Sequence, residues 1–166
     1  MKQILDSGDR TEFESGAVRD MHEGKGRCDL LPLDVIGDLF NDGADDVYKS
    51  SVFKRIRQFQ EKADIVYLNV LLDSFMEQRK WDVHTMILEV AKHFEEGAKK
   101  YGENNWRKGI PVRVYIDSAI RHYLKFIRGD QDEPHDRTFC WNILCAIWTC
   151  KNKPELNDYG KGGEQE

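Results

Sequence analysis

Acidic side chains recur through the stretch from Glu89 to Asp136. They are Glu89, Glu95, Glu96, Asp117, Asp132, Glu133 and Asp136. Hard divalent cations such as Mg²⁺ bind several oxygen ligands, and carboxylates on different helices can meet in the core of a helical bundle. These seven residues are therefore candidate metal ligands. The alternative is that they are solvated helix faces, which is the usual place of Glu in a chain that is 33% charged.

A second group of candidates is basic and lies near the N-terminus. Arg19, Lys25 and Arg27 stand among several glycines. Glycine lets a backbone approach a phosphate closely, and Arg or Lys then neutralises its charge. The spacing of a Walker A loop is absent, so this segment is either a phosphate-binding loop or a plain surface loop.

Helices must position these side chains. Apolar spacing predicts helices at about 33–40, 50–78, 83–101 and 111–128, and another that opens at about residue 132. Asp82 suits the N-cap of the third, and Gly129 ends the fourth. The stripe within 50–78 carries no catalytic residue type, and we assign it to packing or subunit contacts.

Three of the candidate acids depend on these helical positions. Glu133 and Asp136 are three residues apart, which predicts that both lie over the first turn of the last helix; ordinary compensation of the helix dipole is the alternative. Asp117 and Arg121 are one turn apart and also suit a simple ion pair. His93 is interpreted as a surface or core residue rather than a ligand.

Composition limits the class of protein. The 166 residues fit one domain, and the net charge of −5 argues against a protein that coats nucleic acid. There is no apolar run of about 18 residues and no secretory signal, so we expect no membrane partner and a cytoplasmic location. The four cysteines form no CxxC pair, so we expect reduced thiols and no zinc.

Four ordered segments together resemble a known family. They are GAVRDMHEGKGRCDLLPLDVI, HFEEGAKKYGENNWRKGIP, YIDSAIRHYLKFIRG and DEPHDRTFCWNILCAIWTC. They resemble the phage and bacterial dATP/dGTP diphosphohydrolases, which are related to the MazG-like all-α nucleoside triphosphate pyrophosphohydrolases. The resemblance spans a domain at 13–152, with 50–78 as an inserted helix and flexible tails at 1–12 and 153–166.

The resemblance implies an all-α fold and a metal-dependent hydrolase. Two or more Mg²⁺ or Mn²⁺ ions would serve cleavage of a purine deoxynucleoside triphosphate to monophosphate and pyrophosphate in a bacterial or phage-infected cytoplasm. MazG-like enzymes carry an ExxE and an ExxD pair. The second is present as Glu133–Asp136, whereas Lys92 stands where the first would need an acid. Glu89, Glu95 and Glu96 therefore all stay candidates on the first helix, with Glu89, Glu96, Glu133 and Asp136 as the catalytic set.

Substrate contacts are expected on residue chemistry and motif position. Candidates for holding the triphosphate are Arg19, Lys25, Arg27 and Lys100. Tyr101 or Trp106 is a candidate for stacking on the base and Asn105 for reading its edge, and Arg121 is a further substrate-binding candidate. The rival interpretations are a nucleotide-binding or regulatory phage protein without turnover, and a structural helical protein. Related bundles are often oligomers, so we also expect a homo-oligomer that acts on a small-molecule nucleotide.

Overall fold

The computed structural model describes residues 8–21, 23–40 and 46–160, and helices carry most of them. In these residues the α-helices are α1 (Leu33–Asp38), α2 (Asp46–Lys62), α3 (Val66–Arg79), α4 (Val83–Tyr101), α5 (Val112–Arg128) and α6 (His135–Asn152). Short 3₁₀ helices are η1 (Cys28–Leu30), η2 (Asn105–Lys108) and η3 (Pro154–Leu156). One small antiparallel hairpin pairs β1 (Arg10–Glu12) with β2 (Val18–Asp20). The predicted all-α fold class is confirmed.

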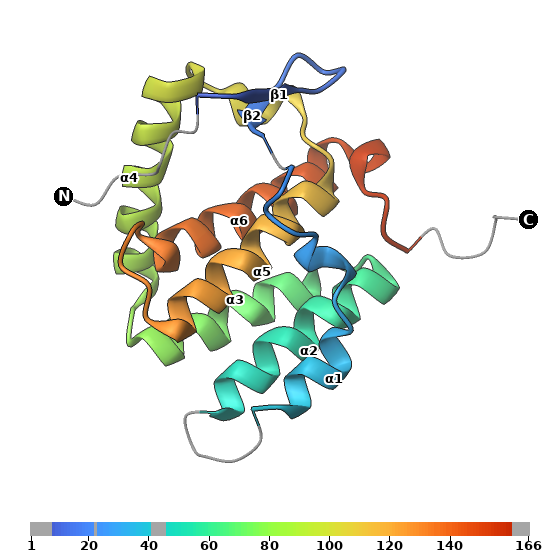
Figure 1. Cartoon of the computed structure of the whole chain (residues 1–166), viewed down its shortest axis with the longest axis vertical. Coiled ribbons are helices and arrows are strands. Elements are labelled where there is room, and N and C mark those ends of the chain that lie inside the picture. The colour runs from blue at the N-terminus through green and yellow to red at the C-terminus, as the bar shows by residue number, and fades with distance from the viewer. Residues whose placement is uncertain (1–7, 22, 41–45, 161–166) are drawn as a thin grey trace, which may run out of the picture.

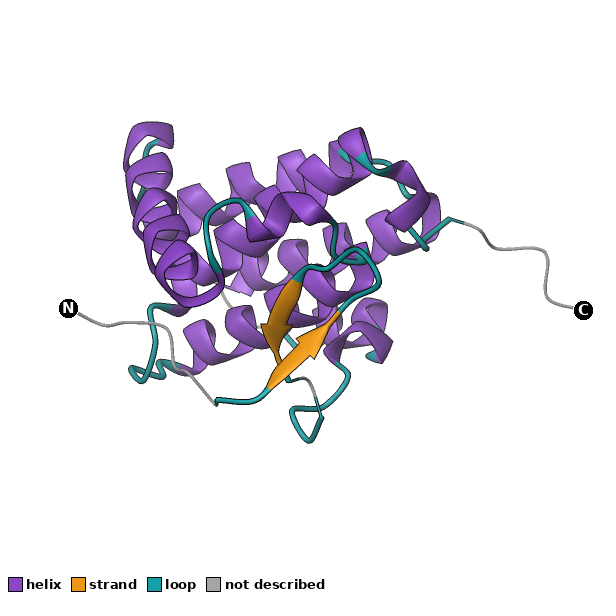
Figure 2. Cartoon of the chain, turned by 90° about the horizontal axis from the view of Figure 1, so that it is seen from above, coloured by secondary structure: helices purple, strands orange, loops and turns teal. Residues whose placement is uncertain are grey.

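Two antiparallel helix pairs form the body of the molecule. Figure 1 shows α5 and α6 side by side, joined by a short loop, with α2 and α3 running along them. Helix α4 stands at a steep angle to the α5–α6 pair and packs on α6. The hairpin lies near the C-terminal end of α4, and the view from above shows it in front of the helices (Figure 2). None of the described helices is long and apolar enough to cross a membrane.

Local capping sets the ends of α4 and α5. Asp82 accepts a hydrogen bond from the Thr85 N–H at 2.7 Å and starts α4. Gly129 adopts φ 87°, and its N–H donates to the Lys125 and Phe126 carbonyl oxygens. Such a left-handed residue after a helix satisfies the last carbonyls. The bounds expected for both helices, 83–101 and an end at 128, are confirmed.

The prediction of a single helix at about 50–78 is wrong, because the structure has the two helices α2 and α3 there. Ala63 adopts φ 54° between them, which ends α2. The Asp64 carboxylate then accepts a hydrogen bond from the Val66 N–H at 2.9 Å, and this supplies the start of α3. The apolar stripe runs across the break without interruption, so its spacing does not reveal the turn.

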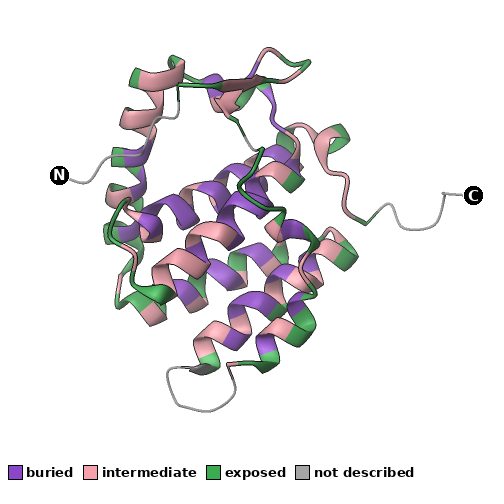
Figure 3. Ribbon diagram, viewed as in Figure 1, coloured by how far each residue is buried: buried purple, intermediate pink, exposed green. Residues whose placement is uncertain are grey.

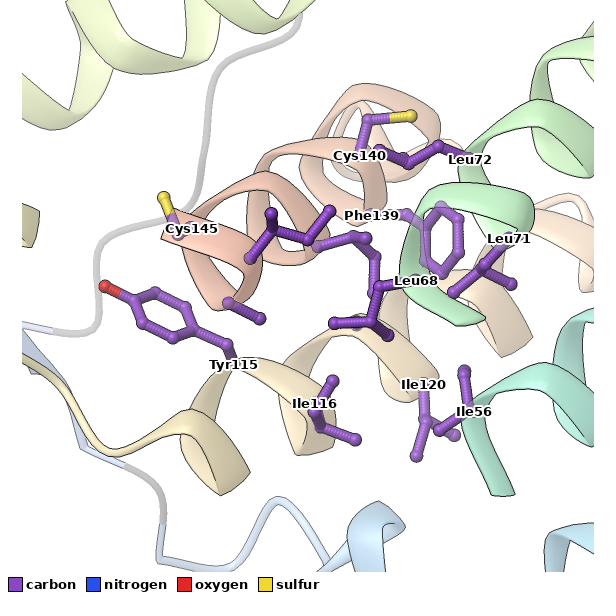
Figure 4. Packing of buried hydrophobic residues seen from close by; sticks show 14 of the residues in the cluster. Ile56, Leu68, Leu71, Leu72, Tyr115, Ile116, Ile120, Phe139, Cys140 and Cys145 are labelled. Carbon is purple, nitrogen blue, oxygen red and sulfur yellow. The ribbon is translucent and has the colours of Figure 1, made fainter. Parts of the chain in front are cut away.

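That stripe lies in the core rather than at a surface. Phe53, Phe59, Leu71 and Phe75 are fully buried or nearly so, and Figure 3 shows the buried faces of the helices turned toward one another. Figure 4 shows Leu68 and Leu71 of α3 close to Phe139 of α6 and Ile120 of α5. The expected choice between packing and subunit contacts is therefore decided in favour of packing.

Packing continues beyond residue 152, where the sequence places the domain boundary. The Leu156 side chain lies against Gly109, and the ring of Tyr159 meets that of Phe59 edge to face at 5.6 Å. At the other end, β1 begins at Arg10 within the expected N-terminal tail. The rest of the two expected tails, 1–7 and 161–166, lies outside the described residues.

Candidate functional site

A cavity of about 1100 Å³ lies between α4, β2, η2 and the α5–α6 pair. Its volume slightly exceeds the roughly 300–1,000 Å³ that is typical of pockets for drug-sized ligands. Many residues predicted from the sequence line it. They are Arg19, Lys25, Glu95, Lys100, Tyr101, Asn105, Trp106, Arg121 and Glu133. Glu89, Glu96, Arg27, Asp117, Asp132 and Asp136 lie outside the lining.

Arg19 places a buried cation at the cavity. Its Nη2 donates to Ser118 Oγ at 3.1 Å and to Asn142 Oδ1 at 2.8 Å, and its guanidinium lies over the rings of Tyr115 and Trp141. Burial lowers the pKa of Arg19, although an arginine side chain remains protonated in proteins. The Nη1 atom is buried and has no hydrogen-bond partner within the described part of the chain. An anion in the cavity supplies the kind of acceptor that this nitrogen lacks.

Asp20 organises the cations beside Arg19. Its carboxylate accepts from Lys100 Nζ at 2.7 Å, from Tyr101 Oη at 2.9 Å and from Arg10 Nη1 at 3.0 Å. Burial and the bond to Asp20 raise the pKa of the Tyr101 hydroxyl, which therefore stays protonated as a donor. Asp20 was not a candidate from the sequence, yet it ties the hairpin to the end of α4.

Arg121 orders the glycine-rich loop. Its Nη2 pairs with Asp117 at 2.5 Å, which is the ion pair that the spacing allowed. The same side chain donates to the backbone carbonyls of Lys25 and Gly26, at 3.2 and 2.8 Å. Asp117 also accepts a hydrogen bond from the Cys28 N–H at 2.6 Å. Asp117 is thus occupied in holding the loop, and Lys25 is brought to the cavity.

Arg27 lies apart from this group. It makes two hydrogen bonds to Asp29, at 2.7 and 2.6 Å, and this pairing raises the pKa of the guanidinium. The side chain of Asp29 is only 4% exposed. Arg27 therefore neutralises a buried carboxylate and does not reach the cavity.

The acids of α4 do not converge. Glu89 pairs with Lys92 and Glu95 with Lys99, one turn away along the same helix. Glu96 pairs instead with Arg137 of α6, whose side chain is buried. Each carboxylate faces a different cation, so these three candidate ligands do not face one common position.

Glu133 and Asp136 also point to different places. Helix α6 begins at His135, so Glu133 precedes it and only Asp136 lies in its first turn. The Asp136 carboxylate pairs with Arg79 of α3 at 2.9 Å. The expectation that both lie over one helical turn is wrong, because Pro134 occupies the N-cap position between them.

Two histidines, His122 and His135, lie beside Glu133, and His122 and Glu133 line the cavity. His122 Nδ1 and His135 Nδ1 are 2.9 Å apart, and Glu133 Oε2 lies 4.0 and 3.9 Å from them. His135 Nε2 lies 2.7 Å from Asp132 Oδ1, and this bond lowers the pKa of the Asp132 carboxyl. Burial, with the neighbouring His135, lowers the pKa of His122 well below its usual value. His122, Glu133 and His135 are thus close enough to hold one metal ion.

The two histidines were not candidates from the sequence. They stand near the ends of an antiparallel helix pair, with Glu133 in the loop between them. Pairing of those helices brings positions 122 and 135 together. The sequence could therefore have indicated these two histidines through the expected antiparallel pairing of the two helices. His93, for which the sequence leaves a surface and a core position open, is buried near Thr138.

Aromatic rings also line the cavity. Trp106 lies 5.2 Å from Phe94 and 4.9 Å from Trp148, between ring centres. Asn105 precedes Trp106 but is occupied, because its amide accepts from the Val18 N–H at 2.9 Å and donates to the Val18 carbonyl at 2.8 Å. Asn105 therefore serves as a partner for β2, which leaves its amide unavailable for reading a base.

Comparison with known proteins adds a family to this geometry. Residues 81–159 match the family model described as dATP/dGTP diphosphohydrolase, N-terminal. The matched segment contains α4, η2, α5 and α6, which supply most of the cavity. Neither the curated proteins nor the solved structures that were searched gave a match to this chain. The resemblance predicted from the sequence is confirmed over residues 81–159.

Proposed function

We propose that this protein hydrolyses a purine deoxynucleoside triphosphate, dATP or dGTP, to the monophosphate and pyrophosphate. The family match supports hydrolysis of a dATP- or dGTP-class substrate. The single observation that carries the proposal to this cavity is the buried Arg19, whose Nη1 has no hydrogen-bond partner among the described residues. A triphosphate offers the charged oxygens that such a donor binds best.

The cavity divides into a phosphate side and a base side. Arg19, Lys25, Lys100 and Arg121 supply positive charge from β2, the glycine-rich loop, α4 and α5. In this arrangement they hold the phosphates and offset the charge that grows on them during attack. Trp106 also lines the cavity and provides an aromatic ring for the purine.

The catalytic carboxylate is assigned to Glu133. Of the four acids expected to be catalytic, it is the one that lines the cavity; Glu89, Glu96 and Asp136 pair with Lys92, Arg137 and Arg79. A divalent ion bound there would polarise a phosphoryl oxygen and lower the pKa of a bound water. The all-carboxylate cluster expected for two or more Mg²⁺ ions does not fit this arrangement, because every expected acid except Glu133 pairs with a different Lys or Arg side chain.

A substrate and product screen tests this function. The chain is incubated with dATP, dGTP, dCTP and dTTP in ¹⁸O-labelled water, with Mg²⁺, Mn²⁺ or Zn²⁺ in separate reactions. Attack at the α-phosphorus places the label in the monophosphate and leaves pyrophosphate unlabelled. Orthophosphate as the first product would contradict the proposal, and equal rates on dCTP and dATP would remove the purine preference.

The pairing of most predicted acids with cations favours a second candidate, a nucleotide-binding protein without turnover. The same experiment separates the two when binding is measured beside it. Tight binding of dATP or dGTP, with no product under any of the three metals, would select the non-catalytic function.

A further inference from the structure

We propose that His122, Glu133 and His135 bind one divalent transition-metal ion, in preference to Mg²⁺. The binding of the ion does not depend on the proposed function, whereas its use in hydrolysis rests on that function. The three side chains come from α5, the α5–α6 loop and the start of α6. The site therefore lies where α5 and α6 pack against each other.

The spacing of the donor atoms suits a single ion. Two ligands that are each about 2.1 Å from a metal lie about 3 Å apart at a right angle and about 4 Å apart at an angle of about 140°. The two Nδ1 atoms are 2.9 Å apart, and Glu133 Oε2 lies 4.0 and 3.9 Å from them. An ion between the three donors needs only small movements of these side chains.

Asp132 orients His135 for this role. Its Oδ1 lies 2.7 Å from His135 Nε2, so the Nε2–H donates to the carboxylate and the lone pair is left on Nδ1. That nitrogen faces His122 and Glu133. A histidine that ligates a metal through one nitrogen and donates to a carboxylate through the other is the usual arrangement in metal sites.

The donor types decide which metal is preferred. Imidazole suits Zn²⁺, Ni²⁺ and related ions, whereas Mg²⁺ takes oxygen ligands in a regular octahedron. Two nitrogens and one carboxylate therefore favour a transition metal. His122 and Glu133 line the cavity, so the remaining coordination positions face the place where the substrate binds.

A neighbouring set of donors is a weaker site. Asp130, Asp132 and His135 also lie close together, but Asp130 pairs with Arg128 and Asp132 pairs with Lys125. A metal there would have to displace both cations. The set that includes His122 and Glu133 faces the cavity instead.

Metal binding to the full chain tests the proposal directly. The chain is stripped with a chelator, and binding of Zn²⁺ and Mg²⁺ is measured by calorimetry and of Co²⁺ by visible absorption. We expect one Zn²⁺ or Co²⁺ per chain and weaker binding of Mg²⁺. His122→Gln should lower the Zn²⁺ affinity about tenfold or more, and Asp132→Asn should do so by about 10–100-fold.

The matched control is His84→Gln, since His84 is an exposed residue on α4 outside the cluster. It should bind Zn²⁺ like the parent, and circular dichroism should show that all variants are folded. His122→Gln binding like the parent, or Mg²⁺ binding as tightly as Zn²⁺, would overturn the proposal. If one metal ion binds at this site and no nucleotide is hydrolysed, the metal site is supported and the proposed hydrolase function is rejected. Full Mg²⁺-supported hydrolysis by His122→Gln would keep the enzyme and show that hydrolysis does not use the ion bound at this site.

Discussion

Arg19 and Arg27 are two arginines of one glycine-containing segment with different surroundings. The guanidinium of Arg19 is held by Ser118 and Asn142 at the cavity, whereas Arg27 is bound to Asp29. Sequence reasoning treats both as phosphate contacts. The structure separates them and provides a matched pair for substitution.

We predict that Arg19→Gln lowers kcat/KM for dATP or dGTP about tenfold or more. The glutamine keeps an amide donor but loses the charge, and a hydrogen bond to a charged group contributes about 1.5–3 kcal/mol. Arg27→Gln should leave kcat/KM nearly unchanged. Steady-state kinetics of both variants measure this, and equal losses in the two would contradict the assignment of Arg19 to the phosphates.

Side-chain chemistry was predictable where it depends on neighbours in the sequence. Lys92 and Lys99 stand three and four residues after Glu89 and Glu95, so these ion pairs are visible in helical spacing. Glu96 and Arg137, by contrast, pair although they are 41 residues apart in the sequence. No local pattern reveals such a contact, because it depends on how α4 crosses α6.

At the scale of elements, Asn105 connects η2 to the hairpin. Its amide exchanges two hydrogen bonds with the backbone of Val18, in the way that a neighbouring strand would. Val18 precedes Arg19, so this connection fixes the backbone that carries the cavity cation. Asn105 is also buried, and loss of its amide would leave the Val18 groups without these partners.

We predict that Asn105→Ala loosens the hairpin and raises KM for the nucleotide, with a loss of about 1–3 kcal/mol in the free energy of unfolding. Hydrogen exchange of the peptide around Val18 should accelerate, while peptides of α5 should not change. Asn104→Gly is the control, because Asn104 is exposed and has φ 58°, which glycine adopts without strain. Unchanged exchange at Val18 would show that Asn105 does not hold β2.

Some helix ends were also predictable from nearby residues, whereas others were not. The ends of α4 and α5 follow from Asp82 and Gly129, which act on adjacent backbone. The break between α2 and α3 falls at Ala63, a residue that favours helix. Its left-handed conformation conflicts with that preference, so sequence periodicity predicts one helix where the structure has two.

At the scale of the molecule, the family match and the packing do not share a boundary. The match begins at residue 81. Phe75 of α3 precedes the matched segment, yet its ring contacts rings of α5 and α6. Its ring centre is 5.3 Å from Phe126, 6.1 Å from Tyr123 and 4.6 Å from Phe139. Helices α2 and α3 therefore complete the core under the cavity, and their apolar stripe is not available for subunit contact. The expected homo-oligomer stays a prediction without an assigned interface.

We predict that Phe75→Ala destabilises the whole described fold by about 3–5 kcal/mol, the usual cost of removing a buried aromatic ring. All four tryptophans lie at residue 81 or later, so tryptophan fluorescence reports on the matched segment and circular dichroism on all helices. Urea unfolding should show both signals shifting together to lower urea. Val66→Ala, at a residue on α3 that is 48% exposed, should shift neither by much. A fluorescence transition that stays in place while part of the helical signal is lost would mean that α2 and α3 form a separate unit.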